Sequence, residues 1–539
     1  MTPQRPSFLL LGLGLLALGL ALPILALLAS WLTLDGEGGQ ILTEMAVTVL
    51  PDYALTSVWL CLGVGLGVVG VGTVSALVVT LFEFKGRRLL EWALLLPMAM
   101  PAYVLAYAYT DFLQYSGPLQ SALREALGWQ GRVLPEVRSL GGAMVVFTLA
   151  LYPYVYVLAR AALAERAHPL MEAARLLGAP YGRRLWRVAL PLARPAVAAG
   201  VALALMEVLA DFGVSSYFGI QTFTAGIYKA WLAMDNRMAA AQLSTALLAV
   251  VALLLAWEKR SQSRQRFTSG RPDRIGPESQ PTRLVGVRAG LAVLWCLTPV
   301  LMGFALPVVI LLHTLAASDV ALGLSLGRFA AWAGNSLMLA TLTAGLATVL
   351  ALGLSAQVRL QPGPWTRMLS SLVGLGYAMP GAVVVVGLLL PLGALQARWP
   401  DAGVGHVLTA SILGLIWAYL VRFVAVAQQS VHSGYARIPT AVDDGARMLG
   451  ISGLRLVWRV HGPLLRRPLA AAALLVFVDV MKELPVTLVL RPFDTDTLAV
   501  MAHQLARDER LGEAALPALA LVVVGLLPVL LLSRALRQR

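Results

Sequence analysis

Four acidic side chains stand inside two long apolar segments of this 539-residue chain. They are Glu207 and Asp211 in one segment, and Asp479 and Glu483 in the other. An ionised group costs roughly 2.5 to 3.5 kcal/mol at the centre of a membrane helix, so each acid is expected to have a partner or a function. The acids of a pair are four residues apart and would share one helical face, from which their oxygens could contact a cation.

The alternative interpretation of these acids is structural. They would pair with Lys482 and with neighbouring helix ends, and so hold helices together. Both interpretations stay open on the sequence alone. The six histidines show no spacing typical of metal ligands, so no metal site is assigned.

The elements that carry these acids are predicted to be membrane helices. Charged residues make up 13% of the chain, whereas about 25% is usual in soluble proteins, and the mean hydropathy is +0.76. Since about 20 apolar residues cross a bilayer, the sequence predicts twelve spans, with no soluble domain of useful size between them. These are residues 8–31, 56–81, 89–112, 140–162, 196–217, 238–257, 289–313, 334–357, 369–393, 404–427, 469–490 and 512–533.

The net charge of +14 does not indicate nucleic-acid binding, because most of the 42 Lys and Arg residues fall in alternate loops. This asymmetry is the positive-inside rule, and it predicts that both termini are cytoplasmic. The first apolar segment is longer than the apolar core of a secretory signal and is expected to be a retained helix. The expected environment is therefore a lipid bilayer that the chain crosses many times.

The chain contains an internal duplication. Glu172 to Gly178 matches Asp444 to Gly450 at an offset of 272 residues, and Pro101 matches Pro380 at an offset of 279. Each copy has six predicted spans, so the copies are parallel repeats. The predicted division is residues 1–258, a flexible cytoplasmic linker at 259–288, and residues 289–539.

The duplication also relates the acids to one another. Glu207 corresponds to Asp479, and Asp211 to Glu483, so four carboxylates would surround a central path in its outer half. The matched prolines, Pro101 and Pro380, are expected to kink the third span of each copy. Tyr103 and Tyr107, which follow Pro101, and the methionines beside the two prolines are expected to serve in packing.

Each copy also places a short charged helix on the predicted cytoplasmic side, between its fourth and fifth spans. In the first copy Ala173, Ala174 and the leucines after them favour a helix that Gly178 ends. A second helix is predicted to start near Tyr181 and to end at Pro191 and Pro195. The second copy repeats the pattern with the same spacing between its residues. A loop that only anchors the chain by its charge would not need to keep this spacing.

This pattern resembles the cytoplasmic signature of permease subunits of ATP-binding-cassette (ABC) importers. The signature residues are Glu172, Ala173, Ala174 and Gly178 in the first copy, and Asp444, Gly445, Ala446 and Gly450 in the second. The resemblance implies coupling helices at 172–179 and 444–451 that dock into separate ATPase subunits, and the all-α fold of a type I importer with about 12 transmembrane helices. Gly445 replaces the second residue of the signature and costs about 1 kcal/mol of helix propensity against Ala.

Residues 205–228 and 478–500 are similar to the fused permeases of bacterial iron(III) importers. The resemblance implies ferric iron as substrate, a hard cation that prefers oxygen ligands, delivered by a periplasmic or extracellular binding protein to a permease in the bacterial inner membrane. Thiamine, polyamine and phosphonate importers share the fold and remain alternative assignments.

The energy source is expected to lie in another protein. None of the four lysines follows a glycine, so the chain has no phosphate-binding loop of the Gly-Lys-Ser/Thr type. The glycines from Gly65 to Gly70 match a dinucleotide-binding spacing, but inside an apolar segment they predict close helix packing. We therefore expect no enzyme activity and no cofactor in this chain, with Mg-ATP held by two copies of a partner ATPase. A rival interpretation is a secondary transporter driven by an ion gradient.

Overall fold

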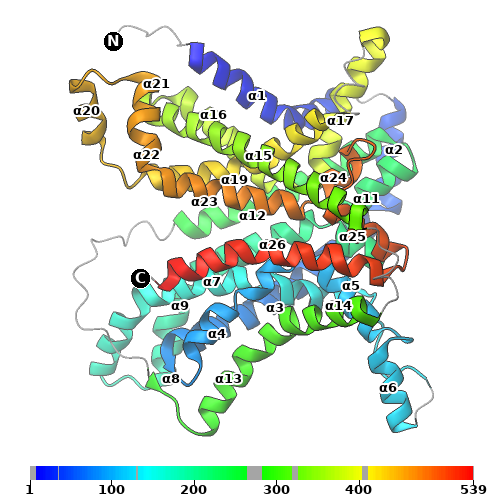
Figure 1. The fold of residues 1–539 in the computed structure, drawn as a ribbon, viewed down its shortest axis with the longest axis vertical. Helices are drawn as coiled ribbons and strands as arrows, with labels where there is room; N and C mark the ends of the chain where they lie inside the picture. Colours follow the sequence, from blue (N-terminus) through cyan, green and yellow to red (C-terminus); the bar gives the residue numbers. More distant parts are fainter. Residues whose placement is uncertain are drawn as a thin grey trace. The chain divides into compact units, whose positions relative to one another are not determined.

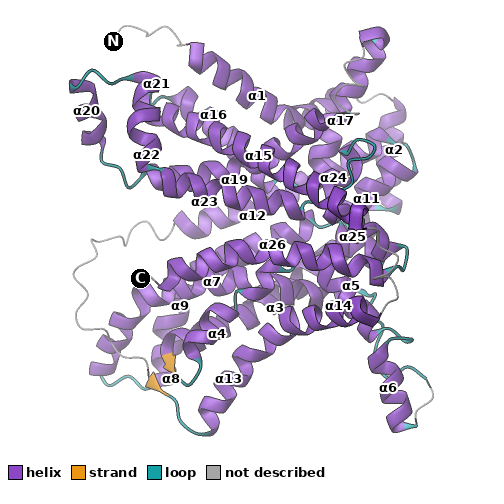
Figure 2. Cartoon of the chain, viewed as in Figure 1, coloured by secondary structure: helices purple, strands orange, loops and turns teal. Residues whose placement is uncertain are grey.

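The computed structural model describes residues 8–33, 36–128, 131–263, 282–317, 326–402 and 411–537, and it is almost entirely helical (Figures 1 and 2). The first copy contains the elements α1 (Phe8–Ala29), η1 (Ser30–Thr33), α2 (Gly36–Thr48), α3 (Leu50–Leu81), β1 (Phe82–Glu83), α4 (Arg87–Ala93), η2 (Leu96–Ala99), α5 (Ala102–Leu113), α6 (Pro118–Leu127), α7 (Leu140–Leu176), α8 (Tyr181–Arg184), η3 (Leu185–Ala189), α9 (Leu190–Ala210), α10 (Gly213–Phe218), α11 (Phe223–Tyr228), η4 (Lys229–Ala233) and α12 (Arg237–Ser263).

The second copy repeats the long helices of the first and differs in its short elements. It contains β2 (Thr282–Arg283), α13 (Val287–Val300), η6 (Leu301–Ala305), α14 (Leu306–Ala317), α15 (Leu326–Leu360), α16 (Pro364–Gly374), η8 (Leu375–Ala378), α17 (Gly381–Arg398), η9 (Pro400–Ala402), α19 (Ile412–Tyr435), α20 (Thr440–Met448), α21 (Gly453–Leu456), η10 (Val457–His461), α22 (Gly462–Leu464), α23 (Arg466–Lys482), α24 (Pro485–Leu490), α25 (Leu498–Arg507) and α26 (Leu511–Arg537).

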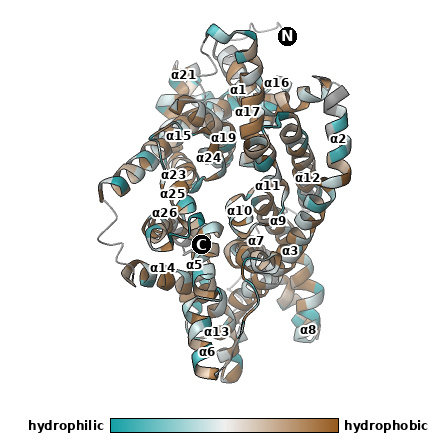
Figure 3. Ribbon diagram, turned by 90° about the vertical axis from the view of Figure 1, so that its right-hand side faces the viewer, coloured by the Kyte–Doolittle hydropathy of each residue, from teal (hydrophilic) through white to brown (hydrophobic). Residues whose placement is uncertain are grey.

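Ten helices in the described part of the chain are long and apolar enough to cross a membrane, and a bent pair makes an eleventh candidate. Figure 3 shows apolar residues along these long helices and hydrophilic residues on shorter elements such as α2 and α8. The polytopic all-α fold is thus confirmed. The predicted span at 469–490 is not one helix, because α23 ends at Lys482 after 17 residues and the chain breaks before α24.

The third span of each copy breaks at its matched proline. Pro101 precedes α5 and Pro380 precedes α17, both with extended backbone (ψ of 139° and 143°). In the first copy the helical stretches on either side of the break meet at 90°. The expected kinks are therefore complete breaks, because proline has no N–H to continue a helix and disfavours helical backbone in the residue before it.

The fifth span of each copy breaks at its second acid. Helix α9 ends before Asp211 and α23 ends before Glu483, and both acids have extended backbone (ψ of 133° and 119°). The first acid of each pair lies in the long helix and the second is the C-cap residue of that helix, with a helical φ (−72° and −69°), so the shared helical face stays a prediction. The predicted repeat offset holds at these breaks, which are 272 residues apart.

The helices group into two compact units that do not follow the two copies in sequence. Unit 1 comprises residues 1–46, 227–248 and 325–501, and unit 2 comprises residues 47–226, 249–324 and 502–539. In unit 1, α1 packs against α16 and α17 of the second copy. In unit 2, α14 packs against α5 of the first copy and against α26. The copies have thus exchanged their first helices, whereas the division at 259–288 remains a prediction about sequence domains.

Most of the predicted linker lies outside the described residues. Its end is ordered, because Thr282–Arg283 (β2) forms a parallel pair with Phe82–Glu83 (β1), in which Phe82 is opposite Thr282 (Figure 2). The start of the predicted linker, residues 259–263, continues α12, and the predicted flexible segment between residues 264 and 281 lies outside the described residues.

Glycines allow α3 and α7 of unit 2 to approach closely. A Cβ at Gly67 would lie 2.3 Å from the Thr148 hydroxyl oxygen, and one at Gly72 would lie 2.9 Å from the backbone oxygen of Tyr152. Of the glycines in the predicted pattern, Gly67 is closely packed as expected, whereas nothing lies within 4 Å of a Cβ at Gly70.

Gly72→Ala is expected to destabilise the protein by about 1–3 kcal/mol, because the added methyl group meets the backbone of α7. Gly70→Ala is the matched control, since nothing lies within 4 Å of a Cβ at Gly70. Thermal unfolding of the purified protein in detergent measures both. Equal melting temperatures for the two variants would show that the close contact is not needed.

Candidate functional site

The first projection, residues 172–179, is the end of a long helix. Helix α7 runs without interruption for 37 residues to Leu176. Gly178 then adopts a left-handed backbone (φ of 78°) and its N–H donates to the Arg175 carbonyl at 2.9 Å. The Ala179 N–H donates to the Ala174 carbonyl at 3.0 Å, which completes a standard C-terminal cap. The predicted stop at Gly178 is confirmed.

The second projection, residues 444–451, ends in the same way. Gly450 has a φ of 77° and donates to the Arg447 carbonyl at 3.0 Å, and Ile451 donates to the Ala446 carbonyl at 2.9 Å. Its helix, α20, is separate, because α19 ends at Tyr435 and α20 starts after Pro439. The two projections therefore end in the same helix cap but are connected to the membrane helices in different ways.

The helix after the first projection is longer than the sequence predicts. It starts at Tyr181 in the first copy, as expected, but it continues through Pro191 and Pro195 to Ala210. A π-helical turn, η3, precedes Pro191, and the matched turn η10 precedes Pro463. The π-helical turn is wider than an α-helical turn. It makes room for the proline ring, which would otherwise clash with a backbone carbonyl of the preceding turn.

Each projection exposes two adjacent apolar side chains at its tip. Leu176 and Leu177 are 88% and 87% exposed, and the matched Met448 and Leu449 are 89% and 81% exposed. The signature residues beside them follow the same pattern, since Glu172, Ala173, Asp444 and Gly445 are exposed, Ala174 is half-buried and Ala446 is buried. The two projections therefore present the same kind of apolar surface at their tips.

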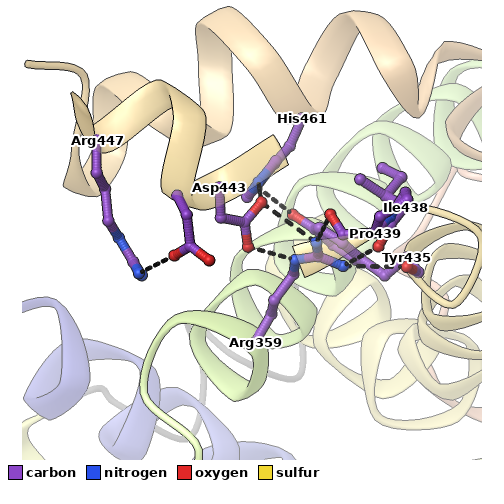
Figure 4. Close-up of polar contacts among 8 residues, drawn as sticks. Arg359, Tyr435, Ile438, Pro439, Asp443, Arg447 and His461 are labelled. Atoms are coloured by element: carbon purple, nitrogen blue, oxygen red, sulfur yellow. Dashed lines mark hydrogen bonds and ion pairs between the residues drawn. The ribbon is translucent and has the colours of Figure 1, made fainter. Parts of the chain in front are cut away.

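A buried polar network, which we call the anchor network, holds the base of the second projection (Figure 4). Arg359 of α15 donates from Nε to Oδ2 of Asp443 at 2.7 Å and from Nη2 to Oδ1 at 3.2 Å. The Arg359 guanidinium also donates to the carbonyls of Tyr435, Ile438 and Pro439 at 3.0–3.1 Å. One arginine thus binds the loop before α20 and the first turn of α20.

His461 completes the anchor network from the other side. Its Nε2 lies 3.0 Å from Oδ1 of Asp443, and its Nδ1 lies 3.1 Å from the Tyr435 hydroxyl. Burial alone would raise the pKa of Asp443, but the hydrogen bonds and charges of Arg359 and His461 outweigh burial and hold that pKa below its usual value. The carboxylate is therefore ionised at neutral pH, and its contribution to stability is lost only when the pH falls through this lowered pKa.

The first copy has apolar residues where the second has the anchor network. At the offset of 272, Tyr435 corresponds to Leu163, Asp443 to Met171 and His461 to Ala189, and these three residues are buried. A continuous helix connects the first projection to its span, so apolar packing suffices there. The second projection lacks this helical connection and is held by an ion pair.

The membrane acids form matched helix caps. Oδ1 of Asp211 accepts from the N–H of Val214 at 2.9 Å and of Ser215 at 3.3 Å, both in α10. Oε2 of Glu483 accepts from the N–H of Val486 at 3.0 Å and of Thr487 at 3.2 Å, both in α24. Each acid thus satisfies donors at the start of the short helix that follows its break.

The two capping acids differ in charge balance. Glu483 is 4% exposed and accepts from Arg422 Nη1 at 2.7 Å, so its charge is neutralised within unit 1. Arg422 corresponds to Ala150 at the offset of 272, so unit 2 has no arginine in the matched place for Asp211. Glu207 and Asp479 lie in α9 and α23, and both are half-buried.

The sequence did not reveal the anchor network or the ion pair of Glu483. Arg422 interrupts a predicted span, as the acids do, and this signal could have marked it as a partner. Arg359 and Asp443 are 84 residues apart, and no motif connects them. No group of three or more His, Cys, Asp or Glu side chains that could hold a metal lies within the described residues.

Comparisons with known proteins agree with this geometry. The family model for the binding-protein-dependent transport system inner membrane component matches residues 68–258 and 349–539. The chain is 25% identical to the Fe(3+)-transport system permease protein FbpB 2 of Haemophilus influenzae over 99% of both chains. It is 23% identical to the probable ABC transporter permease protein y4fN of Sinorhizobium fredii, over 89% of this chain and 86% of the relative. It is 30% identical to the probable sulfate transport system permease protein cysT of Chlorokybus atmophyticus, over 26% of this chain and 48% of the relative.

Arg359→Leu is expected to destabilise the protein by about 3–5 kcal/mol, because it leaves the buried Asp443 without its cation. A composite variant with the residues of the first copy (Tyr435→Leu, Asp443→Met and His461→Ala, added to Arg359→Leu) should recover most of this loss, since no buried charge remains. Unfolding of both variants in detergent is the measurement. A composite variant less stable than Arg359→Leu would contradict this account of the network.

Proposed function

Since the chain belongs to the family of binding-protein-dependent transport system inner membrane components, whose members are permeases of ABC transporters, we propose that it imports ferric iron. A binding protein would deliver the iron, and two copies of a separate ATPase would drive alternating access. The chain is a multi-pass membrane protein, and we propose that both of its termini are cytoplasmic.

The similarity that extends along the whole chain supports iron as the substrate. The relative named for Fe(3+) transport matches both copies, whereas the relative named for sulfate transport matches 26% of the chain. The membrane acids also suit a hard cation. Thiamine, polyamine, phosphonate or sulfate is the alternative substrate class.

The tips of the projections support the coupling role. Each presents two fully exposed apolar side chains beside a helix cap of the same geometry. A receptor groove on an identical ATPase subunit would need the same tip on both projections. The different bases then convey the movement of that tip into the membrane helices, through α7 in one copy and through the anchor network in the other.

We propose that the membrane acids contact the substrate unequally. Glu483 caps α24 and pairs with Arg422, so its role is mainly structural. Asp211, with Glu207 one turn before it, offers the carboxylate that no matched arginine neutralises. A transient contact suits transport better than tight binding, because the permeating ion must also leave.

The substrate is tested in proteoliposomes that contain the chain, its ATPase and the binding protein. We expect ATP-dependent uptake of ferric iron, with no uptake of sulfate or of a phosphonate. Uptake of one of those anions without iron would refute the iron assignment. Uptake without the ATPase would refute the ABC mechanism in favour of a secondary transporter.

Replacing Leu177 and Leu449 with Ser is expected to reduce ATP-dependent transport at least about tenfold, because buried apolar anchors dominate the affinity of an interface. Copurification of the ATPase measures the loss of docking directly. Leu127→Ser, at an exposed leucine outside both projections, is the control and should retain transport. Normal ATPase binding by the double variant would exclude the tips as the docking surface.

The double variant Glu207→Gln and Asp479→Asn tests the acids that lie within the long helices. If they contact the ion, transport should fall about tenfold or more, while the protein level and ATPase binding stay normal. Unchanged iron transport would assign these two acids a structural role only.

A further inference from the structure

Unit 2 contains a buried group of phenol, carboxylate and imidazole side chains that coupling does not use. We call it the tyrosine–histidine cluster, and its members are Tyr103, Tyr107, Asp211, Tyr217 and His503. They come from α5, from the break between α9 and α10, from α10 and from α25. Residues from four parts of the chain thus meet at the helix break of this unit.

Tyr107 is the centre of the cluster. Its hydroxyl lies 2.6 Å from Nδ1 of His503, and its ring centroid lies 4.6 Å from that of Tyr217 and 5.8 Å from that of Tyr103. Asp211 is joined to the helix of Tyr217, because its Oδ1 accepts from the N–H groups of Val214 and Ser215 in α10. The three tyrosines and His503 are 1–6% exposed, so their polar atoms are removed from bulk solvent.

His503 has one buried nitrogen that the described part of the chain does not satisfy. Nδ1 is bound to Tyr107, whereas Nε2 is buried and has no hydrogen-bond partner there. A buried polar atom without a partner costs free energy. Histidines that bind metals share this arrangement, because one ring nitrogen takes the metal and the other is fixed by a hydrogen bond.

The second copy provides an internal comparison. At the repeat offsets, Tyr103 corresponds to Ala382, Tyr107 to Val386 and Tyr217 to Val489. Small apolar residues therefore occupy these three matched places, although Tyr228 and Tyr419 are buried elsewhere at the break of unit 1. This comparison argues against the purely packing role that the sequence predicts for Tyr103 and Tyr107.

The histidine also has a counterpart in the other unit. Thr222 and Thr497 both cap the short helix that follows, so α11 corresponds to α25 and Tyr228 corresponds to His503. The Tyr228 hydroxyl donates to the Pro485 carbonyl at 2.7 Å and is satisfied. Among the described residues, unit 2 thus combines oxygen donors, an acid without a matched arginine and a histidine whose Nε2 has no partner, and the break of unit 1 does not.

We propose that the tyrosine–histidine cluster is a transit site for the ferric ion, an inference that rests on the proposed function. Phenolate and carboxylate oxygens suit a hard trivalent cation, and imidazole is a common ligand of iron. The phenols must release their protons when the ion binds. Since the site lies at a helix break, a movement of α9 relative to α10 would separate the donors and release the ion.

Two arginines face the cluster and limit its affinity. The Arg138 guanidinium carbon lies 4.7 Å from the centre of the Tyr217 ring, and Arg138 Nη2 donates to the Tyr217 hydroxyl at 3.3 Å. Arg507 lies one helical turn after His503 and acts on it electrostatically. These cations stabilise a phenolate and repel the ion, so the site is suited to transient occupation.

Ferric nitrilotriacetate added to the purified full-length chain in detergent is the test. Iron bound to phenolate should give a visible absorption band that is absent from the free chelate. Tyr107→Phe is expected to weaken this binding about 10- to 100-fold, and His503→Gln should weaken it in the same direction. Tyr109→Phe is the matched control, because Tyr109 is buried in the same helix but donates to the Met302 carbonyl. Melting temperatures verify that the variants fold.

The outcomes separate this inference from the proposed function. If the wild type shows no band, or if Tyr107→Phe binds iron as the wild type does, the cluster is not an iron site. If the assembled transporter with Tyr107→Phe still imports iron at the wild-type rate, the transit site is refuted and the iron function stands. If the assembled transporter imports an anion and no iron, the proposed function is refuted, and the transit site that rests on it is refuted as well.

Discussion

A polypeptide inside a bilayer must satisfy every backbone N–H and C=O by itself, because lipid offers neither donors nor acceptors. This chain nevertheless breaks its third and fifth spans, at the same places in both copies. The breaks in the fifth spans are sustained by Asp211 and Glu483, each of which accepts N–H donors at the start of the next short helix. The acids that would be costly in a continuous helix are therefore what makes the interrupted helix possible.

The duplication shows how one architecture can hold two different sets of side chains. Both copies keep the caps, the breaks and the glycine stops, which depend on backbone geometry. They differ in the charged networks, since unit 1 neutralises Glu483 with Arg422 and anchors the second projection with Arg359. Unit 2 instead keeps the polar cluster around Tyr107. The two units therefore hold different polar side chains around helix breaks of the same geometry.

The sequence predicted the features that local chemistry determines. Apolar length gave the membrane helices, the repeat offset matched the two projections, and Gly178 and Gly450 ended their helices as glycine in a left-handed conformation does. It did not predict that Asp211 and Glu483 lie beyond their helices, because a carboxylate can equally extend from a helical face or cap a break. It also missed the partners of Asp443 and Glu483, since pairs of residues 84 and 61 positions apart leave no periodic signal.

The exchange of first helices has a consequence for how the protein is made. Unit 1 needs α1, which is synthesised first, together with helices of the second copy, and unit 2 needs α13, α14 and α26, which are synthesised after the linker. Neither unit can close on the ribosome before the chain is nearly finished. Helices α3, α7 and α9 can pack against one another early, but α1 must wait in the bilayer until its partners α16 and α17 are made.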